Sequence, residues 1–146
     1  WSLIRELKKA SPVPVIGSGD IFEPADALTM FRETGCDAVM IGRGAMGNPW
    51  IFTRVKKLMA GLPDPGGPGV EERFRQAVEH ADMMVRESGG EEKRALIMMR
   101  KHFACYTRGL ADASILRQEL FSCLSLEQVK IIFNHYLERY KCTLKG

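Results

Sequence analysis

Two short apolar runs, each ended by a glycine turn, decide the fold of this chain: Pro12-Val13-Pro14-Val15-Ile16-Gly17-Ser18-Gly19-Asp20 and Ala38-Val39-Met40-Ile41-Gly42-Arg43-Gly44. Apolar, β-branched runs bounded by Pro and Gly are typical of buried parallel strands. Between them, Pro24 suits the first turn of a helix that runs to about Thr34, and Gly35 suits its C-cap. The second turn starts 25 residues after the first, the spacing of a βαβ crossover. Residues 1–60 are therefore expected to hold two βα units, with a short helix before them and a helix to about Met59 at their end.

A segment rich in glycine and proline, residues 61–69, follows this region. Such a composition supports neither helix nor strand and indicates a linker at a domain boundary. Residues 70–146 contain no proline and read as four helices, at about 70–88, 91–107, 112–123 and 125–141. Ser125 and Gln128 form a capping-box pattern at the start of the last one. The expected fold class is α/β followed by an all-α helical bundle.

Length and composition limit the class of protein. The chain has 146 residues, of which 45% are hydrophobic and 27% charged, values typical of a globular domain. No apolar run reaches the roughly 18 residues of a membrane span, and the start at Trp1 has no signal-peptide pattern, so we interpret the chain as a cytoplasmic fragment. Four scattered cysteines predict neither a disulfide framework nor a metal site: Cys36, Cys105, Cys123 and Cys142.

The C-terminal part of the chain is the more basic one. Residues 1–89 hold 11 Lys and Arg against 12 Asp and Glu, whereas residues 90–146 hold 10 against 6. At 100° per residue, Arg94, Lys101 and Arg108 lie on one side of the second of these helices, opposite an apolar stripe. A row of cations can follow a phosphate backbone, although a solvated helix face gives the same pattern. His80, His102 and His135 have no partner at helical spacing, so each is expected to be an isolated packed or surface histidine.

A glycine turn between a strand and a helix exposes backbone N–H groups at the positive end of the helix dipole, where phosphate binds. One such turn is weak evidence, but in a (β/α)8 barrel the loops after the last two strands commonly build one phosphate site together. Arg43 could place its guanidinium on phosphate oxygens or could cap a carbonyl. Asp20 is expected to accept hydrogen bonds from loop N–H groups and so to stabilise the turn.

Three segments resemble the end of the barrel in tRNA-dihydrouridine synthases: Val15 to Ile21, Gly35 to Gly44, and Asn48-Pro49-Trp50-Ile51-Phe52. The resemblance implies the last two βα units of an FMN-binding TIM barrel. It assigns the FMN phosphate to Ser18, Gly19, Asp20, Gly42 and Arg43, with Ser18 standing where the family usually has Asn.

The helical half carries a second part of the resemblance. Met99-Arg100-Lys101-His102-Phe103 through Gly109, followed by Ile115-Leu116-Arg117, is similar to the signature of the family's helical domain. That domain helps to hold tRNA, so the resemblance implies RNA-binding roles for Arg94, Arg100, Lys101 and Arg108.

The implied reaction is the reduction of uridine to 5,6-dihydrouridine in tRNA, with FMN as hydride carrier and NADPH as reductant. The family's general acid is a cysteine on an earlier barrel loop, and none of the four cysteines here matches it. We therefore expect no catalytic residue in this chain, no activity of the chain alone, a monomeric parent enzyme, and self-association of the isolated chain through unpaired strands. Two alternatives stay open: another FMN-binding barrel of the dihydroorotate dehydrogenase-like kind, and a non-enzymatic RNA-binding helical module.

Overall fold

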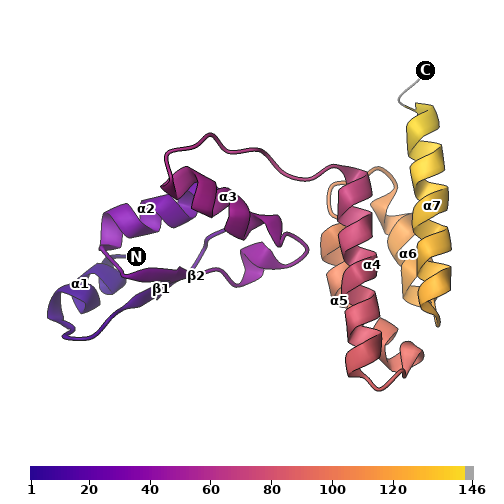
Figure 1. The fold of residues 1–146 in the computed structure, drawn as a ribbon, viewed down its shortest axis with the longest axis horizontal. Coiled ribbons are helices and arrows are strands. Elements are labelled where there is room, and N and C mark those ends of the chain that lie inside the picture. The colour runs from indigo at the N-terminus through magenta and orange to yellow at the C-terminus, as the bar shows by residue number, and fades with distance from the viewer. Residues whose placement is uncertain (144–146) are drawn as a thin grey trace. The chain divides into compact units, whose positions relative to one another are not determined.

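The computed structural model describes the backbone of residues 1–143 and the side chains of residues 1–141. Cys142 has no described side chain. The chain divides into two compact units, the first comprising Trp1–Gly67 and the second beginning at Pro68 (Figure 1). In the part of the chain that is described, no helix combines the length and the apolar character needed to cross a membrane.

Six elements build the first unit: α1 (Ser2–Ala10), β1 (Ile16–Ser18), α2 (Pro24–Thr34), β2 (Ala38–Met40), the 3₁₀ turn η1 (Arg43–Ala45) and α3 (Trp50–Met59). β1 and β2 pair in parallel with Ile16 opposite Ala38 and Ser18 opposite Met40. α2 joins the strands and contacts both of them, and α1 and α3 pack against α2 (Figure 1). Gly35 ends α2 in a left-handed conformation with φ of 69°, as the sequence predicts.

The first strand differs from its expected position. The apolar run Pro12–Ile16 predicts the strand before the glycine turn, but the strand begins at Ile16 and extends into the turn as far as Ser18. Pro12 and Pro14 have no N–H group to donate to a ladder, so regular pairing starts only beyond them. The carbonyl oxygen of Val15 accepts a hydrogen bond of 2.9 Å from Asp37 N, which aligns the strand starts.

The prediction of two buried strands is also wrong for one face of the sheet. Gly17 and Val39 face α2, whereas Ile16 and Met40 on the other face are 65% and 57% exposed. The core of this unit lies on the α2 side and comprises Val15, Ile21, Ala27, Met30, Cys36, Ile51 and Val55. A sheet of two strands covered on one side leaves the apolar side chains of the other side in water.

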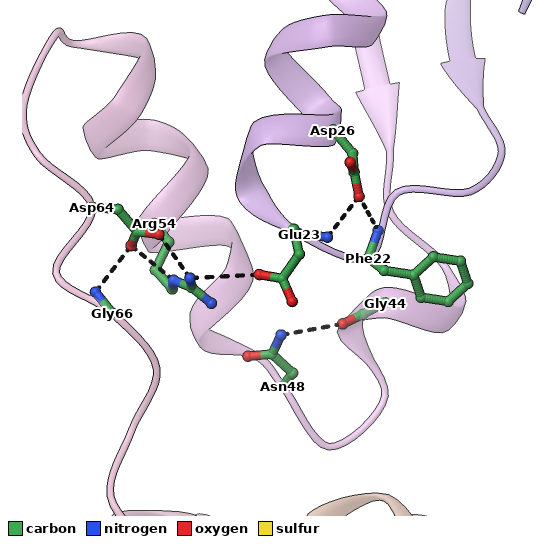
Figure 2. A network of polar contacts seen from close by, with 8 residues as sticks. All are labelled: Phe22, Glu23, Asp26, Gly44, Asn48, Arg54, Asp64 and Gly66. Atoms are coloured by element: carbon green, nitrogen blue, oxygen red, sulfur yellow. Dashed lines mark hydrogen bonds and ion pairs between the residues drawn. The ribbon is translucent and has the colours of Figure 1, made fainter.

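An ionic cluster ties the glycine–proline segment to the first unit. Arg54 on α3 donates hydrogen bonds of 2.8 and 2.7 Å to the two carboxylate oxygens of Asp64, and its Nη2 lies 3.6 Å from Glu23 (Figure 2). The Arg54 side chain is only 14% exposed, and its hydrogen bonds hold the pKa of Asp64 at about 2. Residues 61–67 of the expected 61–69 linker belong to the first unit, although all of them are exposed and Asp64 makes the contact with Arg54.

Between Pro68 and Thr143 the second unit contains four helices: α4 (Val70–Glu87), α5 (Glu92–Tyr106), α6 (Ala113–Ser122) and α7 (Leu126–Thr143). Each matches its expected range to within two residues. α4 packs against α5 and α7, and α6 packs against α5 and α7. The predicted capping box is present, because Gln128 N donates to Ser125 Oγ and Ser125 N donates to Gln128 Oε1.

An aromatic core joins these helices. The rings of Phe74 on α4 and Phe133 on α7 stack with centroids 4.2 Å apart, and Phe103 on α5 meets Phe133 edge-on. The apolar stripe expected on α5 is buried at four positions, Leu96, Met99, Phe103 and Tyr106.

Arg73 on α4 secures the C-terminal end of α5. Its Nη2 donates hydrogen bonds to the carbonyl oxygens of Tyr106 and Arg108, the second at 2.7 Å. Carbonyls at a helix C-terminus have no partner within the helix, so a cation from a neighbouring helix satisfies them.

The replacement Arg73→Met keeps the apolar stem and removes the donors. We expect the free energy of unfolding of the helical unit to fall by about 1–3 kcal/mol, because the partly buried carbonyl of Tyr106 and the exposed carbonyl of Arg108 lose their partner. Urea denaturation followed by circular dichroism measures the change. Arg75→Gln, on the same helix and well exposed, is the matched control and should change stability by less than about 0.5 kcal/mol. Equal stability of the two variants would show that this cap contributes nothing.

Two histidines expected to be isolated lie together. The rings of His80 on α4 and His102 on α5 have centroids 4.6 Å apart, and Tyr106 Oη lies 3.4 Å from His80 Nδ1. Sequence spacing could not show this contact because it joins two helices. Burial lowers the pKa of both imidazoles, and for His102 the neighbouring His80 and Lys101 lower it further. The neutral forms are therefore favoured in the folded state.

These pKa shifts predict loss of stability in mild acid. The unfolded state binds more protons than the folded state below the ordinary histidine pKa of about 6.5, so this stability is present above that pH and is lost as the pH falls through the lowered folded values. Between pH 7.5 and 5, the free energy of unfolding should fall more steeply for the parent chain than for the double variant His80→Gln/His102→Gln. His135→Gln, an exposed site on α7, should behave like the parent chain.

Candidate functional site

The carboxyl ends of β1 and β2 meet at one edge of the sheet, and the loops that follow them surround a concavity of about 180 Å³. All five residues expected to hold a phosphate line it: Ser18, Gly19, Asp20, Gly42 and Arg43. Ile21, Phe22, Met40 and Gly44 complete the lining. Parallel pairing brings the two glycine turns together although they are far apart in sequence.

The two turns touch through their backbones. A Cβ atom added to Gly44 would lie 2.1 Å from the carbonyl oxygen of Ile21 and 3.1 Å from Phe22 Cα, so only glycine permits this approach. In the first turn, Gly19 and Asp20 have φ of 132° and 52°. Trp1 Nε1 donates a hydrogen bond of 3.0 Å to the Gly19 carbonyl and anchors the turn from α1. Backbone sterics thus determine the shape of the concavity.

The N-terminus of α2 differs from the expected anion site. One carboxylate oxygen of Asp26 accepts hydrogen bonds from Phe22 N at 2.9 Å and from Glu23 N at 2.8 Å (Figure 2). Glu23 and Asp26 together form a capping box. The Asp26 carboxylate therefore occupies backbone amides at the start of α2 that we expected to bind a phosphate. Donors to an anion must come from the glycine turns themselves and from Arg43.

Arg43 extends between a carboxylate and an aromatic ring. Its Nη2 donates a hydrogen bond of 2.9 Å to Asp20 Oδ1, and its Cζ lies 5.4 Å from the centroid of the Phe22 ring, within cation–π range. We expected loop amides as the donors to Asp20; the donor in the structure is Arg43. Both side chains are 74% exposed, so the pair is open to solvent and its net stabilisation is small.

This arrangement has unused donors of the kind that bond phosphate oxygens. A guanidinium has five donors, and Asp20 uses one of them, so the remaining donors can bond phosphate oxygens. The Asp20 carboxylate repels a dianion but orients the guanidinium toward the concavity. Sequence reasoning missed Phe22 and Trp1 as neighbours of the site. Phe22 could have been found from its position two residues after Asp20. The Trp1 contact could not, because it depends on the packing of α1.

The basic residues expected to contact RNA belong to the second unit. Arg94 and Lys101 on α5 and Arg108 just after it are exposed, whereas Arg100 is half-buried. Arg94 Nη1 lies 3.8 Å from Glu91, a loose pair that leaves most of its donors in water. The four expected residues thus differ in access to a polyanion. Among the described residues, no group of three or more His, Cys, Asp and Glu side chains could hold a metal ion.

Comparison with known proteins gives one consistent family. The family model described as dihydrouridine synthase matches residues 1–141. A probable tRNA-dihydrouridine synthase of Mycobacterium leprae is 36% identical over 135 residues, which cover 92% of this chain and 35% of that protein. Another, probable tRNA-dihydrouridine synthase 1 of Synechocystis, is 32% identical over 144 residues, or 99% of this chain and 40% of that protein. The probable tRNA-dihydrouridine synthase of Aquifex aeolicus is 53% identical over 57 residues. The chain thus spans between a third and two fifths of the length of the first two relatives.

The contact between the turns is tested by Gly44→Ala. Its Cβ would overlap backbone atoms of Ile21 and Phe22, which cannot rotate away, so the turns must separate. We expect a loss of about 1–3 kcal/mol in the stability of the first unit and altered amide shifts at Gly19 and Gly42 in ¹⁵N–¹H spectra. Gly67→Ala, whose Cβ would have no neighbour within 4 Å, is the control. Unchanged spectra for Gly44→Ala would contradict the proposed close approach.

Proposed function

The chain belongs to the dihydrouridine synthase family, and from this premise we propose that it forms part of an FMN-dependent tRNA-dihydrouridine synthase. In this proposal residues 1–60 are the last two βα units of a TIM barrel, 61–69 connect the domains, and 70–146 form a helical tRNA-binding domain. The parallel pairing of β1 and β2 supports the first assignment. The family match also favours this reading over a dihydroorotate dehydrogenase-like barrel and over an RNA-binding module without enzymatic function.

The concavity between the glycine turns is the proposed site of the FMN phosphate. The observation that carries this proposal is the convergence of both turns and Arg43 on one space of about 180 Å³. Turn amides and the Arg43 guanidinium donate to phosphate oxygens, while the missing Cβ at Gly44 lets the two loops close on them. Ser18 offers a hydroxyl donor at the end of β1.

FMN, recharged by NADPH, supplies the hydride that reduces the C5–C6 double bond of uridine. The residues of this chain hold one end of the cofactor and position it. Two strands cannot close a barrel, so in this proposal other strands of the parent enzyme surround the flavin ring and carry the acid. Cys36 and Cys123 are buried here and Cys105 is half-buried, so none of these three is placed as an exposed acid on a barrel loop. The chain alone is therefore proposed to be inactive.

tRNA is the proposed partner of the helical unit. Exposed Arg94 and Lys101 lie on the side of α5 opposite its buried stripe, and exposed Arg108 follows the end of the helix, so that the three can reach successive phosphates. Arg100 is half-buried and has less access, so we expect a smaller contribution from it. A cytoplasmic, monomeric parent enzyme is proposed, with self-association of the isolated chain through the unpaired edges of β1 and β2.

Titration with FMN tests the phosphate site in this chain. ¹⁵N–¹H spectra should show FMN shifting the amides of Gly19, Gly42 and Gly44, whereas riboflavin, which lacks the phosphate, should shift them little. Arg43→Gln should weaken FMN binding about tenfold through loss of a charge-assisted hydrogen bond, and Arg32→Gln on α2 should not weaken it. Equal shifts with riboflavin would place the main contact outside the phosphate site.

Salt dependence tests the tRNA assignment. The logarithm of the association constant for unmodified tRNA should fall linearly with the logarithm of the salt concentration. Removal of one phosphate contact should reduce the magnitude of this slope by about 1. Arg94→Gln and Lys101→Gln are each expected to do so, Arg100→Gln less. Arg86→Gln, an exposed arginine on α4 that pairs with Asp82, is the control. Binding that ignores salt would count against any electrostatic RNA contact.

A further inference from the structure

Two large apolar side chains of α5 are exposed between the cations Arg94 and Lys101. Ile97 and Met98 are 45% and 50% exposed, although Leu96 and Met99 on either side of them in sequence are buried. Arg94, Ile97, Met98 and Lys101 follow the i, i+3, i+4, i+7 pattern and therefore share one side of the helix. Arg94 and Lys101 are about 10.5 Å apart along the helix axis at 1.5 Å per residue.

These apolar side chains belong to a groove of about 510 Å³ at the N-terminal end of α5. The rest of its lining is charged: Glu91, Glu92, Lys93 and Arg94. All six lining residues come from α5 and its N-cap, so the groove is shallow and largely open to solvent. Single exposed apolar residues are common and carry no meaning by themselves. Here the apolar surface lies within a groove and between cations, a combination that restricts the chemistry of its occupant.

The groove offers three kinds of contact that match one nucleotide. Ile97 and Met98 present an apolar surface to the face of a base, as aliphatic wedges do where they contact unstacked bases. Glu91 and Glu92 offer carboxylate oxygens that accept from the amino and imino groups at a base edge. Lys93 and Arg94 of the groove, and Lys101 further along α5 outside it, supply cations for the flanking phosphates. A fully paired RNA strand could use only the cations, because its bases are stacked and paired.

We propose that this groove receives an unpaired base of the bound tRNA, with its phosphates held toward Arg94 and Lys101. The inference rests on the proposed function, because it requires the helical unit to bind tRNA. It adds that recognition by this unit depends on single-stranded or loop nucleotides. The carboxylates at the N-terminal end of the groove repel phosphate, so the strand runs from the groove toward Lys101.

The test is the double variant Ile97→Gln/Met98→Gln in the full chain. Glutamine keeps the helix propensity and side-chain length but removes the apolar surface. Affinity for unmodified tRNA and for a fully paired RNA duplex is measured at several salt concentrations. We expect tRNA binding to weaken by about 5- to 20-fold through loss of base contact. The salt slope and the duplex affinity should stay unchanged. Ile131→Gln, with the same 45% exposure on α7, is the control.

Each other outcome has a distinct meaning. Equal weakening toward tRNA and duplex, or weakening also with Ile131→Gln, overturns the base contact. Unchanged tRNA binding by the double variant also overturns it, while the proposed tRNA-binding function stands. Absence of tRNA binding by the parent chain contradicts the proposed function and this inference together. A change in sedimentation of the double variant without a change in tRNA affinity identifies the groove as a protein contact instead and refutes the proposal. Circular dichroism verifies that all variants are folded.

Discussion

Parallel pairing of β1 with β2 brings the carboxyl ends of both strands to one edge, and the arrangement of the first unit depends on it. Each strand is followed by a turn, so the pairing places two turns side by side. Gly44 then lies against the backbone of Ile21 and Phe22 at a separation that excludes a Cβ atom. Because this contact is between backbones, it forms a concavity whose shape changes little with side-chain rotamers. The candidate site is therefore a consequence of strand pairing and of one glycine.

The electrostatics of the site come from within the unit rather than from a helix dipole. Asp26 binds the amides at the start of α2, and Asp20 binds Arg43. The first contact removes donors that an anion could use, and the second orients a donor that it can use. Acids and a base also pair at Arg54, whose side chain is only 14% exposed and contacts both Asp64 and Glu23 (Figure 2). Asp64 in turn accepts a hydrogen bond from Gly66 N, so this pairing links the segment after α3 to the helix. Charged side chains thus organise loops that have little apolar surface to bury.

The helical unit is held together mainly by aromatic packing between helices. Its four helices meet through aromatic rings, with Phe74 stacked on Phe133, and its polar contacts satisfy helix ends, as Arg73 does for α5. One side of α5 is buried and the other combines cations with exposed Ile97 and Met98. Exposed apolar side chains between cations give this side of the helix a surface that a partner can contact. This division of α5 into a structural and an exposed side connects the stability of the unit to its proposed contact with RNA.

Local signals in the sequence determined much of this structure. Gly35, Pro24 and the Ser125–Gln128 box defined helix ends correctly, because capping depends on residues within one turn of each other. The four helices of residues 70–141 were likewise predicted from periodicity and spacing. The five residues expected to hold a phosphate came instead from the resemblance to a family, and the structure places them around one concavity. The first strand was misplaced, because prolines delay the ladder in a way that only the partner strand reveals. The contacts between His80 and His102, Arg43 and Asp20, and Asp64 and Arg54 join residues at least 10 positions apart, so only the tertiary structure decided them. Sequence periodicity specifies which face of an element is buried, whereas packing specifies what that face meets.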